Sequence, residues 1–323
     1  MVLTIPKEFL MQYLLAFVFI FAGVIHQEAT RITQAADPKS FELPLWESGA
    51  PGALGTEPKD IPMAMVRLPA SNEPTGALVI CPGGGYGTLA MDHEGHQIAA
   101  WANEMGLAAI ICDYRHRGKG YGHPAPSDDA NRAIRLTRSK SNEWNIDPSR
   151  VGIIGFSAGG HLVSTILTQS DVAKSDTGKS NTGKSNTVKS NTADPISDQS
   201  SRPDFGILCY PVIMFGTSET HKGSEKNLLG ASPDPELVKS FANHLRVTSS
   251  TPPTFLMHTQ EDKVVLVGNS LAFYGAMVQN KVPGELHVYE YGRHGIGLGR
   301  NIPDASDWPE ACKRWLRTRK IIQ

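Results

Sequence analysis

The sequence RVGIIGFSAGGH, which runs from Arg150 to His161, contains the pattern that decides the fold. Its apolar first half is typical of a buried β-strand, and the small residues after Ser157 open a helix. The G-x-S-x-G pattern places a serine on a sharp turn between strand and helix, where only small neighbours fit. We therefore predict that Ser157 lies exposed on an elbow at a helix N-terminus. The alternative is a glycine-rich turn with an incidental serine.

Apolar segments of strand length recur along the chain and alternate with segments of helical periodicity. The predicted strands are Met63–Leu68, Ala77–Cys81, Ala108–Cys112, Val151–Gly155, Phe205–Tyr210, Thr254–His258 and Glu285–Glu290. The predicted helices are His96–Met105, Ser127–Glu143, Ala158–Gln169, Ser270–Gln279 and Asp307–Thr318. Near-continuous apolar strands that alternate with helices are typical of a parallel sheet covered on both faces. We predict a doubly wound α/β domain with a mostly parallel central sheet.

A serine hydroxyl becomes a good nucleophile when a histidine takes its proton and a carboxylate orients that histidine. In proteins with this strand–turn–helix pattern, the carboxylate and then the histidine follow the serine along the chain. Asp262 follows a predicted strand, and His294 follows the next strand in a glycine-rich loop. We predict that Asp262 is the acid and His294 the base, with Glu261 as an alternative for the acid. We interpret His161 and His258 as supporting residues.

The sequence CPGGGYGTLA, from Cys81 to Ala90, follows another predicted strand. During acyl transfer, backbone N–H groups must stabilise the negative charge that develops on the carbonyl oxygen. Gly84 and Gly85 lack Cβ atoms and would let a substrate oxygen approach their amides, and Ala158 follows the nucleophile. We predict that these three amides form an oxyanion hole. A turn with a purely conformational role is the alternative.

Three short patterns match parts of cofactor-binding motifs. Gly85–Ala90 matches G-x-G-x-x-A, but a poor helix start follows it and nothing downstream supplies hydride chemistry. Gly178–Ser185 matches a nucleotide-binding G-x-x-x-x-G-K-S pattern without a strand before it or a helix after it. His93–His96 lacks the H-E-x-x-H spacing of a zinc site. We therefore predict no nucleotide, no metal and no other cofactor.

Composition and charge limit the kinds of partner that we expect. The 323 residues are 40% hydrophobic and 20% charged, and the formal net charge is −1. This balance offers no general attraction to nucleic acid or to an anionic membrane, so we expect neither as a partner. Neutral or small substrates are easier to accommodate. Of the four cysteines, Cys81, Cys112 and Cys209 lie in strand-like segments, and we predict buried free thiols rather than disulfides.

Two segments fall outside the α/β pattern. Residues 1–36 contain the apolar run Leu14–Ile25, shorter than the roughly 20 residues that span a bilayer. We predict a secretory signal peptide, or a retained membrane anchor, and hence a secreted or periplasmic protein. Residues 37–323 are predicted to form one domain with a disordered insertion at about 172–202, where a polar five-residue repeat, Lys174–Ala193, lacks an apolar face.

These motifs together resemble the α/β-hydrolase fold of the esterase and lipase superfamily, and in particular the BD-FAE-like carbohydrate esterases. That group is placed with feruloyl and acetylxylan esterases and is often labelled xylanase. The resemblance covers the chain from Leu45 to its end, apart from the repeat. It rests on Leu45–Gly52, Pro82–Tyr86, His123–Pro126, Gly155–His161, Tyr210–Val212 and His294–Gly295.

The resemblance implies a serine ester hydrolase that removes acetyl or feruloyl groups from a carbohydrate such as xylan. By position, it assigns the nucleophile, acid, base and oxyanion donors to Ser157, Asp262, His294, Gly84, Gly85 and Ala158. Two departures stand out: Pro82 replaces the histidine of the commoner H-G-G-G form, and Val265-Leu266 replaces a valine–proline pair. Neither departure removes a chemical group that the mechanism uses.

Three other functions share parts of this pattern. A prolyl-oligopeptidase-like peptidase can share the triad, but it normally carries a large N-terminal propeller, which we do not expect here. A xylan glycosidase uses paired carboxylates, which would leave the serine elbow unexplained. A hydrolase-fold binding module is typically marked by the loss of a triad member, and all three are present here.

Overall fold

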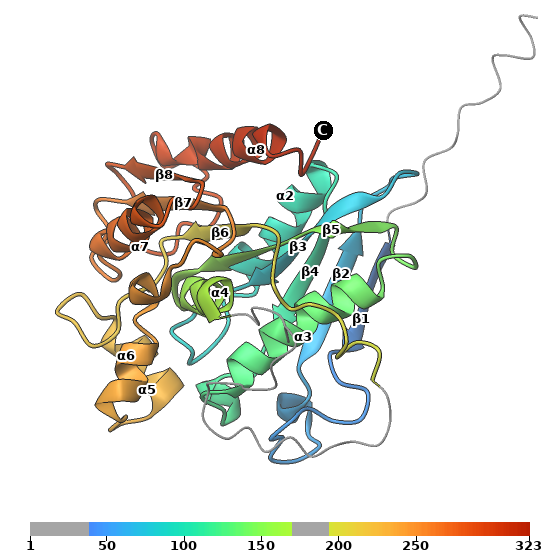
Figure 1. Cartoon of the computed structure of the whole chain (residues 1–323), viewed down its shortest axis with the longest axis horizontal. Coiled ribbons are helices and arrows are strands. Elements are labelled where there is room, and N and C mark those ends of the chain that lie inside the picture. The colour runs from blue at the N-terminus through green and yellow to red at the C-terminus, as the bar shows by residue number, and fades with distance from the viewer. Residues whose placement is uncertain (1–38, 170–193) are drawn as a thin grey trace, which may run out of the picture. The chain divides into compact units, whose positions relative to one another are not determined.

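The computed structural model of the protein describes residues 39–169 and 194–323, and these contain one eight-stranded sheet (Figure 1). The strand order is β1-β2-β4-β3-β5-β6-β7-β8. The strands are β1 (Lys39–Pro44), β2 (Met63–Leu68), β3 (Thr75–Cys81), β4 (Ala108–Asp113), β5 (Ile146–Phe156), β6 (Gly206–Cys209), β7 (Thr254–Thr259) and β8 (Gly284–Tyr289). From β4 to β8 all neighbours are parallel, whereas β1 and β2 form an antiparallel edge.

Strand β3 explains why the sheet is covered on both sides. Ala77, Val79 and Cys81 point into one apolar core, and Leu78 and Ile80 point into the other. Side chains alternate along a strand, so a continuous apolar sequence makes both faces of the strand apolar. Both faces must then be buried against helices.

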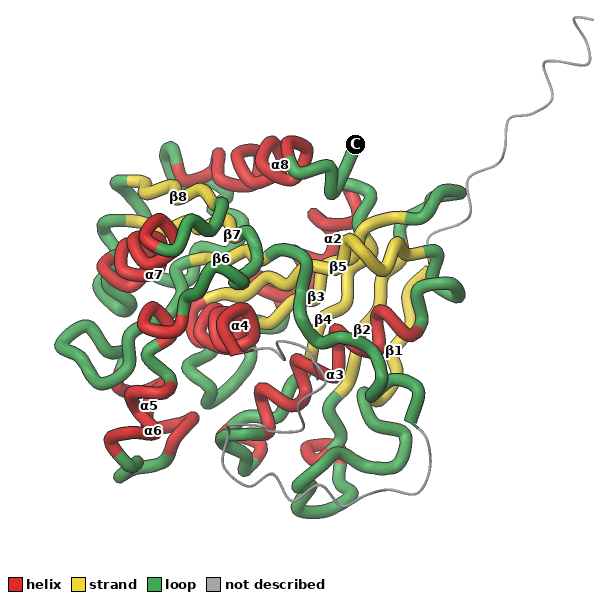
Figure 2. The backbone as a smooth tube through the Cα atoms, in the orientation of Figure 1, coloured by secondary structure: helices red, strands yellow, loops and turns green. Residues whose placement is uncertain are grey.

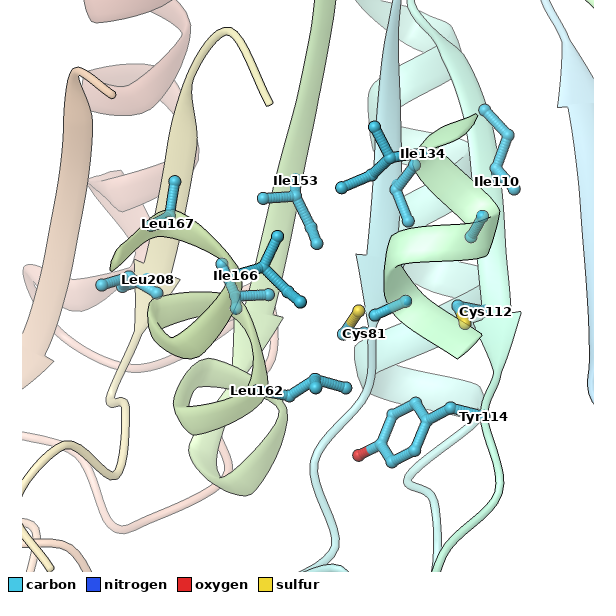
Figure 3. Packing of buried hydrophobic residues seen from close by; sticks show 14 of the residues in the cluster. Cys81, Ile110, Cys112, Tyr114, Ile134, Ile153, Leu162, Ile166, Leu167 and Leu208 are labelled. Atoms are coloured by element: carbon cyan, nitrogen blue, oxygen red, sulfur yellow. The ribbon is translucent and has the colours of Figure 1, made fainter. Parts of the chain in front are cut away.

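The helices supply these two layers (Figure 2). Helices α3 (Ala125–Ser139), α4 (Ser157–Gln169) and α7 (Gly268–Gln279) contribute to one core, and α2 (Gln97–Glu104) and α8 (Trp308–Thr318) contribute to the other. Figure 3 shows the first core, where Ile166 of α4 lies beside Ile153 of the sheet and Leu162 lies toward Cys81 and Tyr114. The remaining helical segments are α5 (Lys222–Leu229), α6 (Pro235–Ser240), η1 (Pro58–Asp60), η2 (Asp92–His96), η3 (Arg117–Lys119), η4 (Asn243–Arg246) and η5 (Ala305–Asp307).

The predicted doubly wound α/β architecture is confirmed. Each predicted strand and helix has a counterpart in the structure, and the largest difference in a helix boundary is at α3, which ends at Ser139 instead of Glu143. Strand β1 and helices α5 and α6 were not predicted. The four cysteines are buried and free, as predicted.

Parts of the predicted domain organisation lie outside the described residues. The leader at 1–36, the whole polar repeat and the nucleotide-like pattern at 178–185 belong to these parts. Residues 194–202, which we assigned to a disordered insertion, require a correction, because Asp194 pairs with Arg132 of α3 and Ile196 is buried. The helices of residues 39–169 and 194–323 include none with the length and apolarity to cross a membrane.

Candidate active site

Ser157 lies at the junction of strand β5 and helix α4. Its φ of 51° is in the left-handed region, which is strained for a serine and is found at functional turns. A Cβ atom added to Gly155 would lie 2.2 Å from the Gly159 carbonyl oxygen, and one added to Gly159 would lie 2.1 Å from the Cys81 carbonyl oxygen. The two glycines of G-x-S-x-G are therefore required by the close approach of the backbone.

His294 connects Ser157 to Asp262. Its Nε2 lies 2.8 Å from Ser157 Oγ, and its Nδ1 lies 2.6 Å from Asp262 Oδ2. Because an ionised carboxylate only accepts hydrogen bonds, Nδ1 carries the proton and Nε2 is free to accept the serine proton. Residues 157, 262 and 294 are far apart in the sequence, but the fold brings their side chains into contact. The histidine lies between the serine and the aspartate, as the sequence predicted.

The prediction that Ser157 is exposed is wrong, because the residue is buried. Only 6% of its surface is accessible. The loop after β3 packs directly against the elbow: a Cβ atom added to Gly83 would lie only 2.9 Å from Ser157 Cβ. The His294 imidazole also contacts the hydroxyl, at 2.8 Å from Oγ. The predicted nucleophile is therefore largely shielded from water.

Asp262 is 2% exposed and is held by several hydrogen bonds. Its Oδ1 accepts the amide N–H groups of Val264 at 2.9 Å and Val265 at 3.0 Å. Burial alone would raise the pKa of Asp262, but its interactions with His258, His294 and the Val265 amide outweigh burial and hold that pKa well below its ordinary value. The carboxylate thus stays ionised next to the imidazole.

The alternative acid, Glu261, has a different position. Its Oε2 accepts the Gly292 amide N–H at 3.0 Å, so this carboxylate fixes the chain two residues before His294 instead of contacting the imidazole. The geometry therefore selects Asp262 over Glu261 as the partner of His294.

Both histidines that we interpreted as supporting residues are buried and bonded at both nitrogens. His258 Nε2 donates to the Val265 carbonyl at 2.9 Å, and its Nδ1 lies 2.8 Å from Ser270 Oγ, so this ring fixes the loop of the acid. His161 Nε2 donates to the Phe241 carbonyl at 3.0 Å. Burial lowers the pKa of His161 to about 4, so the ring is neutral at neutral pH.

The loop after β3 presents the predicted oxyanion donors. Gly84 has a φ of 128°, and a Cβ atom on it would lie 2.3 Å from the Thr88 carbonyl oxygen, so glycine is required there. Gly85 has a φ of 63°. Within the described part of the chain, the amides of Gly84, Gly85 and Ala158 donate to no protein group. These N–H groups are available to a ligand beside Ser157.

Three contacts that sequence reasoning missed anchor this loop. The Gly83 amide donates to Glu94 Oε2 at 2.8 Å, and Asn227 of α5 donates to the Gly85 carbonyl at 2.8 Å. Tyr86 Oη lies 2.9 Å from His161 Nδ1. Glu94 belongs to a segment that we interpreted as a poor helix start and as a failed zinc motif. The one indication of its role was an acidic residue shortly after the glycines.

Glu94 is a buried carboxylate with two donors. Besides the Gly83 amide, it accepts the Tyr210 hydroxyl at 2.9 Å. Burial raises the pKa of Glu94, and the hydrogen bonds from Gly83 and Tyr210 oppose that rise. In residues 39–169 and 194–323, no three His, Cys, Asp or Glu side chains gather in a way that could hold a metal ion.

Comparison with known proteins gives matches over most of the chain. A family model described as BD-FAE matches residues 65–277. An acetylxylan esterase of Xylanibacter ruminicola is 33% identical over 88% of this chain and 52% of its own length. An endo-1,4-beta-xylanase B of Butyrivibrio fibrisolvens is 33% identical over 69% of this chain and 33% of its own length. The chain thus spans about half or less of these two relatives.

A solved structure matches over nearly its whole length. The acetyl ester-xyloside bifunctional hydrolase of Caldicellulosiruptor lactoaceticus is 38% identical, with a TM-score of 0.78. The match covers 88% of this chain and 98% of that chain.

Proposed function

Because the chain belongs to the BD-FAE family, we propose that it is a serine-dependent carbohydrate esterase that removes acetyl groups from xylan. The family assignment confirms the resemblance found in the sequence. The observation that carries the proposal is the hydrogen-bonded series Ser157–His294–Asp262, with distances of 2.8 and 2.6 Å, beside three unoccupied amide donors. Feruloyl is the alternative acyl group.

In the proposed mechanism, Ser157 Oγ attacks the ester carbonyl carbon while His294 Nε2 takes its proton. The Asp262 carboxylate stabilises the imidazolium that forms, and the free amides of Gly84, Gly85 and Ala158 receive the negative charge on the carbonyl oxygen. The C–O bond to the sugar then breaks, and His294 returns the proton to the leaving hydroxyl. Water releases acetate from the acyl-enzyme by the same two steps, with His294 again as base and then acid.

The names of the relatives support this choice of substrate. The relative from X. ruminicola is named for acetylxylan, and the similar solved structure is named for an acetyl ester and a xyloside. We further propose that the protein acts outside the cytoplasm, since a polymeric substrate is met there. The predicted leader at 1–36 supports that location.

The test is product release from acetylated and from feruloylated xylan by wild type and Ser157→Ala. We expect wild type to release acetate, and the variant to lose kcat by on the order of 10⁶-fold, because the hydroxyl that attacks the ester is removed. Acid release that is unchanged in the variant would remove Ser157 from the mechanism. Reducing sugar without free acid would instead favour the glycosidase activity that the xylanase relative's name suggests.

A further inference from the structure

Glu94 and Tyr210 join two loops of the site, and we propose that this pair, the Glu94–Tyr210 bridge, positions the oxyanion donors and the base relative to Ser157. The proposal deepens the proposed function, because it assigns two positioning residues to the same site. Among the described residues, neither side chain is hydrogen-bonded to Ser157, Asp262 or His294. They act through the backbone at Gly83 and at Gly297.

At one end, the bridge fixes the start of the oxyanion loop. Glu94 Oε2 accepts the Gly83 amide at 2.8 Å. A Cβ atom added to Gly83 would lie 2.6 Å from the Phe156 carbonyl oxygen and 2.9 Å from Ser157 Cβ. Gly83 is thus pressed against the nucleophile's own backbone, and the next residues, Gly84 and Gly85, carry the free amides. Any shift of the Gly83 amide moves those donors.

At the other end, the bridge fixes the loop of the base. The Tyr210 hydroxyl donates to Glu94 Oε1 at 2.9 Å and accepts the Gly297 amide at 2.9 Å. The Tyr210 ring also packs edge-on against the His294 ring, with 5.3 Å between the centroids. Trp308 of α8 donates to the Gly297 carbonyl at 3.0 Å, so this peptide unit is held from both sides.

The Glu94–Tyr210 bridge depends on a buried carboxylate whose two oxygens both accept hydrogen bonds. Glu94 is 2% exposed and Tyr210 1% exposed, and a buried carboxylate is costly unless its oxygens accept hydrogen bonds. His93 Nε2 lies 3.7 Å from Glu94 Oε1. Both carboxylate oxygens are used, one for each loop. Glutamine cannot replace it fully, because its amide offers one acceptor oxygen for two donors.

The chain contains a matched control elsewhere. Tyr121 donates its hydroxyl to Asp60 and accepts the Leu54 amide at 2.9 Å, while Asp60 accepts the Glu57 amide at 3.0 Å. This second pair has the same chemistry, because one backbone N–H donates to the tyrosine hydroxyl and another donates to the carboxylate. Both side chains are also buried. Its backbone partners belong to the segment before β2, which holds none of the proposed catalytic groups.

The experiment compares Glu94→Gln, Tyr210→Phe and their double variant with Asp60→Asn and Tyr121→Phe in the full chain. One readout is kcat and KM for an acetylated xylo-oligosaccharide. The second is the rate at which a fluorophosphonate labels Ser157, in which an Oγ–P bond forms, fluoride leaves and His294 takes the proton. The labelling needs no natural substrate, so a wrong carbohydrate assignment does not affect it. Thermal unfolding is measured for every variant.

We expect each bridge variant to lose kcat and labelling rate by about 10-fold to 100-fold, with KM changed less than about threefold, because a small misplacement costs transition-state stabilisation. In kcat and in labelling rate, the double variant should fall no more than about threefold below the less active of the two single variants. Residues that act as one unit give such a non-additive loss. The control variants should keep both rates within about threefold, even where they unfold at lower temperature. Bridge variants that only unfold earlier, with both rates unchanged, would overturn the proposal.

Discussion

Among single residues, the adjacent carboxylates Glu261 and Asp262 test which acid is the functional partner of His294. Asp262→Asn keeps the shape of the side chain but removes the ionised partner of His294 Nδ1, so the imidazole loses its correct tautomer. We expect kcat to fall by about 10⁴-fold, as such a change does in serine hydrolases.

Glu261→Gln is the matched control, because Glu261 lies next to Asp262 but bonds the Gly292 amide. We expect it to change kcat by less than about tenfold, since glutamine can still accept that N–H. Steady-state kinetics on one acetyl ester measure both variants. Equal losses from the two changes would contradict the assignment of Asp262 as the partner of His294.

Single residues also show where sequence reasoning stops. Ser157, Asp262 and His294 could be found because a motif, a chain order and positions after strands identify them. Glu94 and Tyr210 could not, because their hydrogen bond joins residues 116 positions apart and exists only in the folded chain. Nothing in the local sequence distinguishes a carboxylate that accepts a loop amide from one that is solvated.

At the scale of elements, the contact between helix α4 and the loop after β3 decides whether the oxyanion hole forms. Gly159 is on α4, and a Cβ atom there would lie 2.1 Å from the Cys81 carbonyl oxygen and 2.6 Å from the Pro82 carbonyl oxygen. Both contacts are with backbone that cannot rotate away. We predict that Gly159→Ala pushes the loop away from Ser157.

The expected result of Gly159→Ala is a loss of about 1–3 kcal/mol in the free energy of unfolding, the usual cost of overpacking. We also expect kcat to fall by more than about tenfold, because the oxyanion donors move with the loop. Urea denaturation and ester hydrolysis measure the two effects. Gly275→Ala on α7, where an added Cβ meets nothing within 4 Å, is the control. It should leave kcat unchanged and raise the free energy of unfolding by up to about 1 kcal/mol, because alanine favours a helix interior over glycine.

The elements that were not predicted share a physical cause. Strand β1 is exposed at five of its six residues, so it has no apolar face to give a strand pattern, and its pairing with β2 defines it instead. Helices α5 and α6 have eight and six residues, and α6 has no buried residue. Elements that bury little leave little periodicity in the sequence. The central parallel strands bury both faces and could be found.

For the whole molecule, the sheet brings together loops that come from four strands. The oxyanion loop follows β3, Ser157 follows β5, Asp262 follows β7 and His294 follows β8. Because these strands are parallel, their carboxyl ends lie at one edge of the sheet, and ligand sites of open α/β sheets lie at that edge. The alternating pattern of strands and helices therefore predicts the location of the site, although it gives no distances.

The buried His161 links this site to the stability of the whole fold. Its ring is fully buried, joins Tyr86 to the Phe241 carbonyl, and stacks on Phe215 at 4.0 Å. Burial lowers its pKa from 6.5 to about 4, so the unfolded chain binds a proton between these values that the folded chain does not. Stability from this residue is complete above pH 6.5 and is lost as the pH falls toward 4.

We predict that the contribution of His161 to the free energy of unfolding falls by about 2 kcal/mol between pH 7.5 and pH 5. Carboxyl groups whose pKa is raised by desolvation, such as the half-buried Asp128 at about 6, make the fold more stable as the pH falls over the same range. The wild-type curve alone therefore does not isolate His161. The measured quantity is therefore the difference between wild type and His161→Gln in urea denaturation at the two pH values. Glutamine keeps an acceptor for Tyr86 and a donor for Phe241 but does not titrate. A difference that is the same at both pH values would show that His161 does not couple protonation to folding.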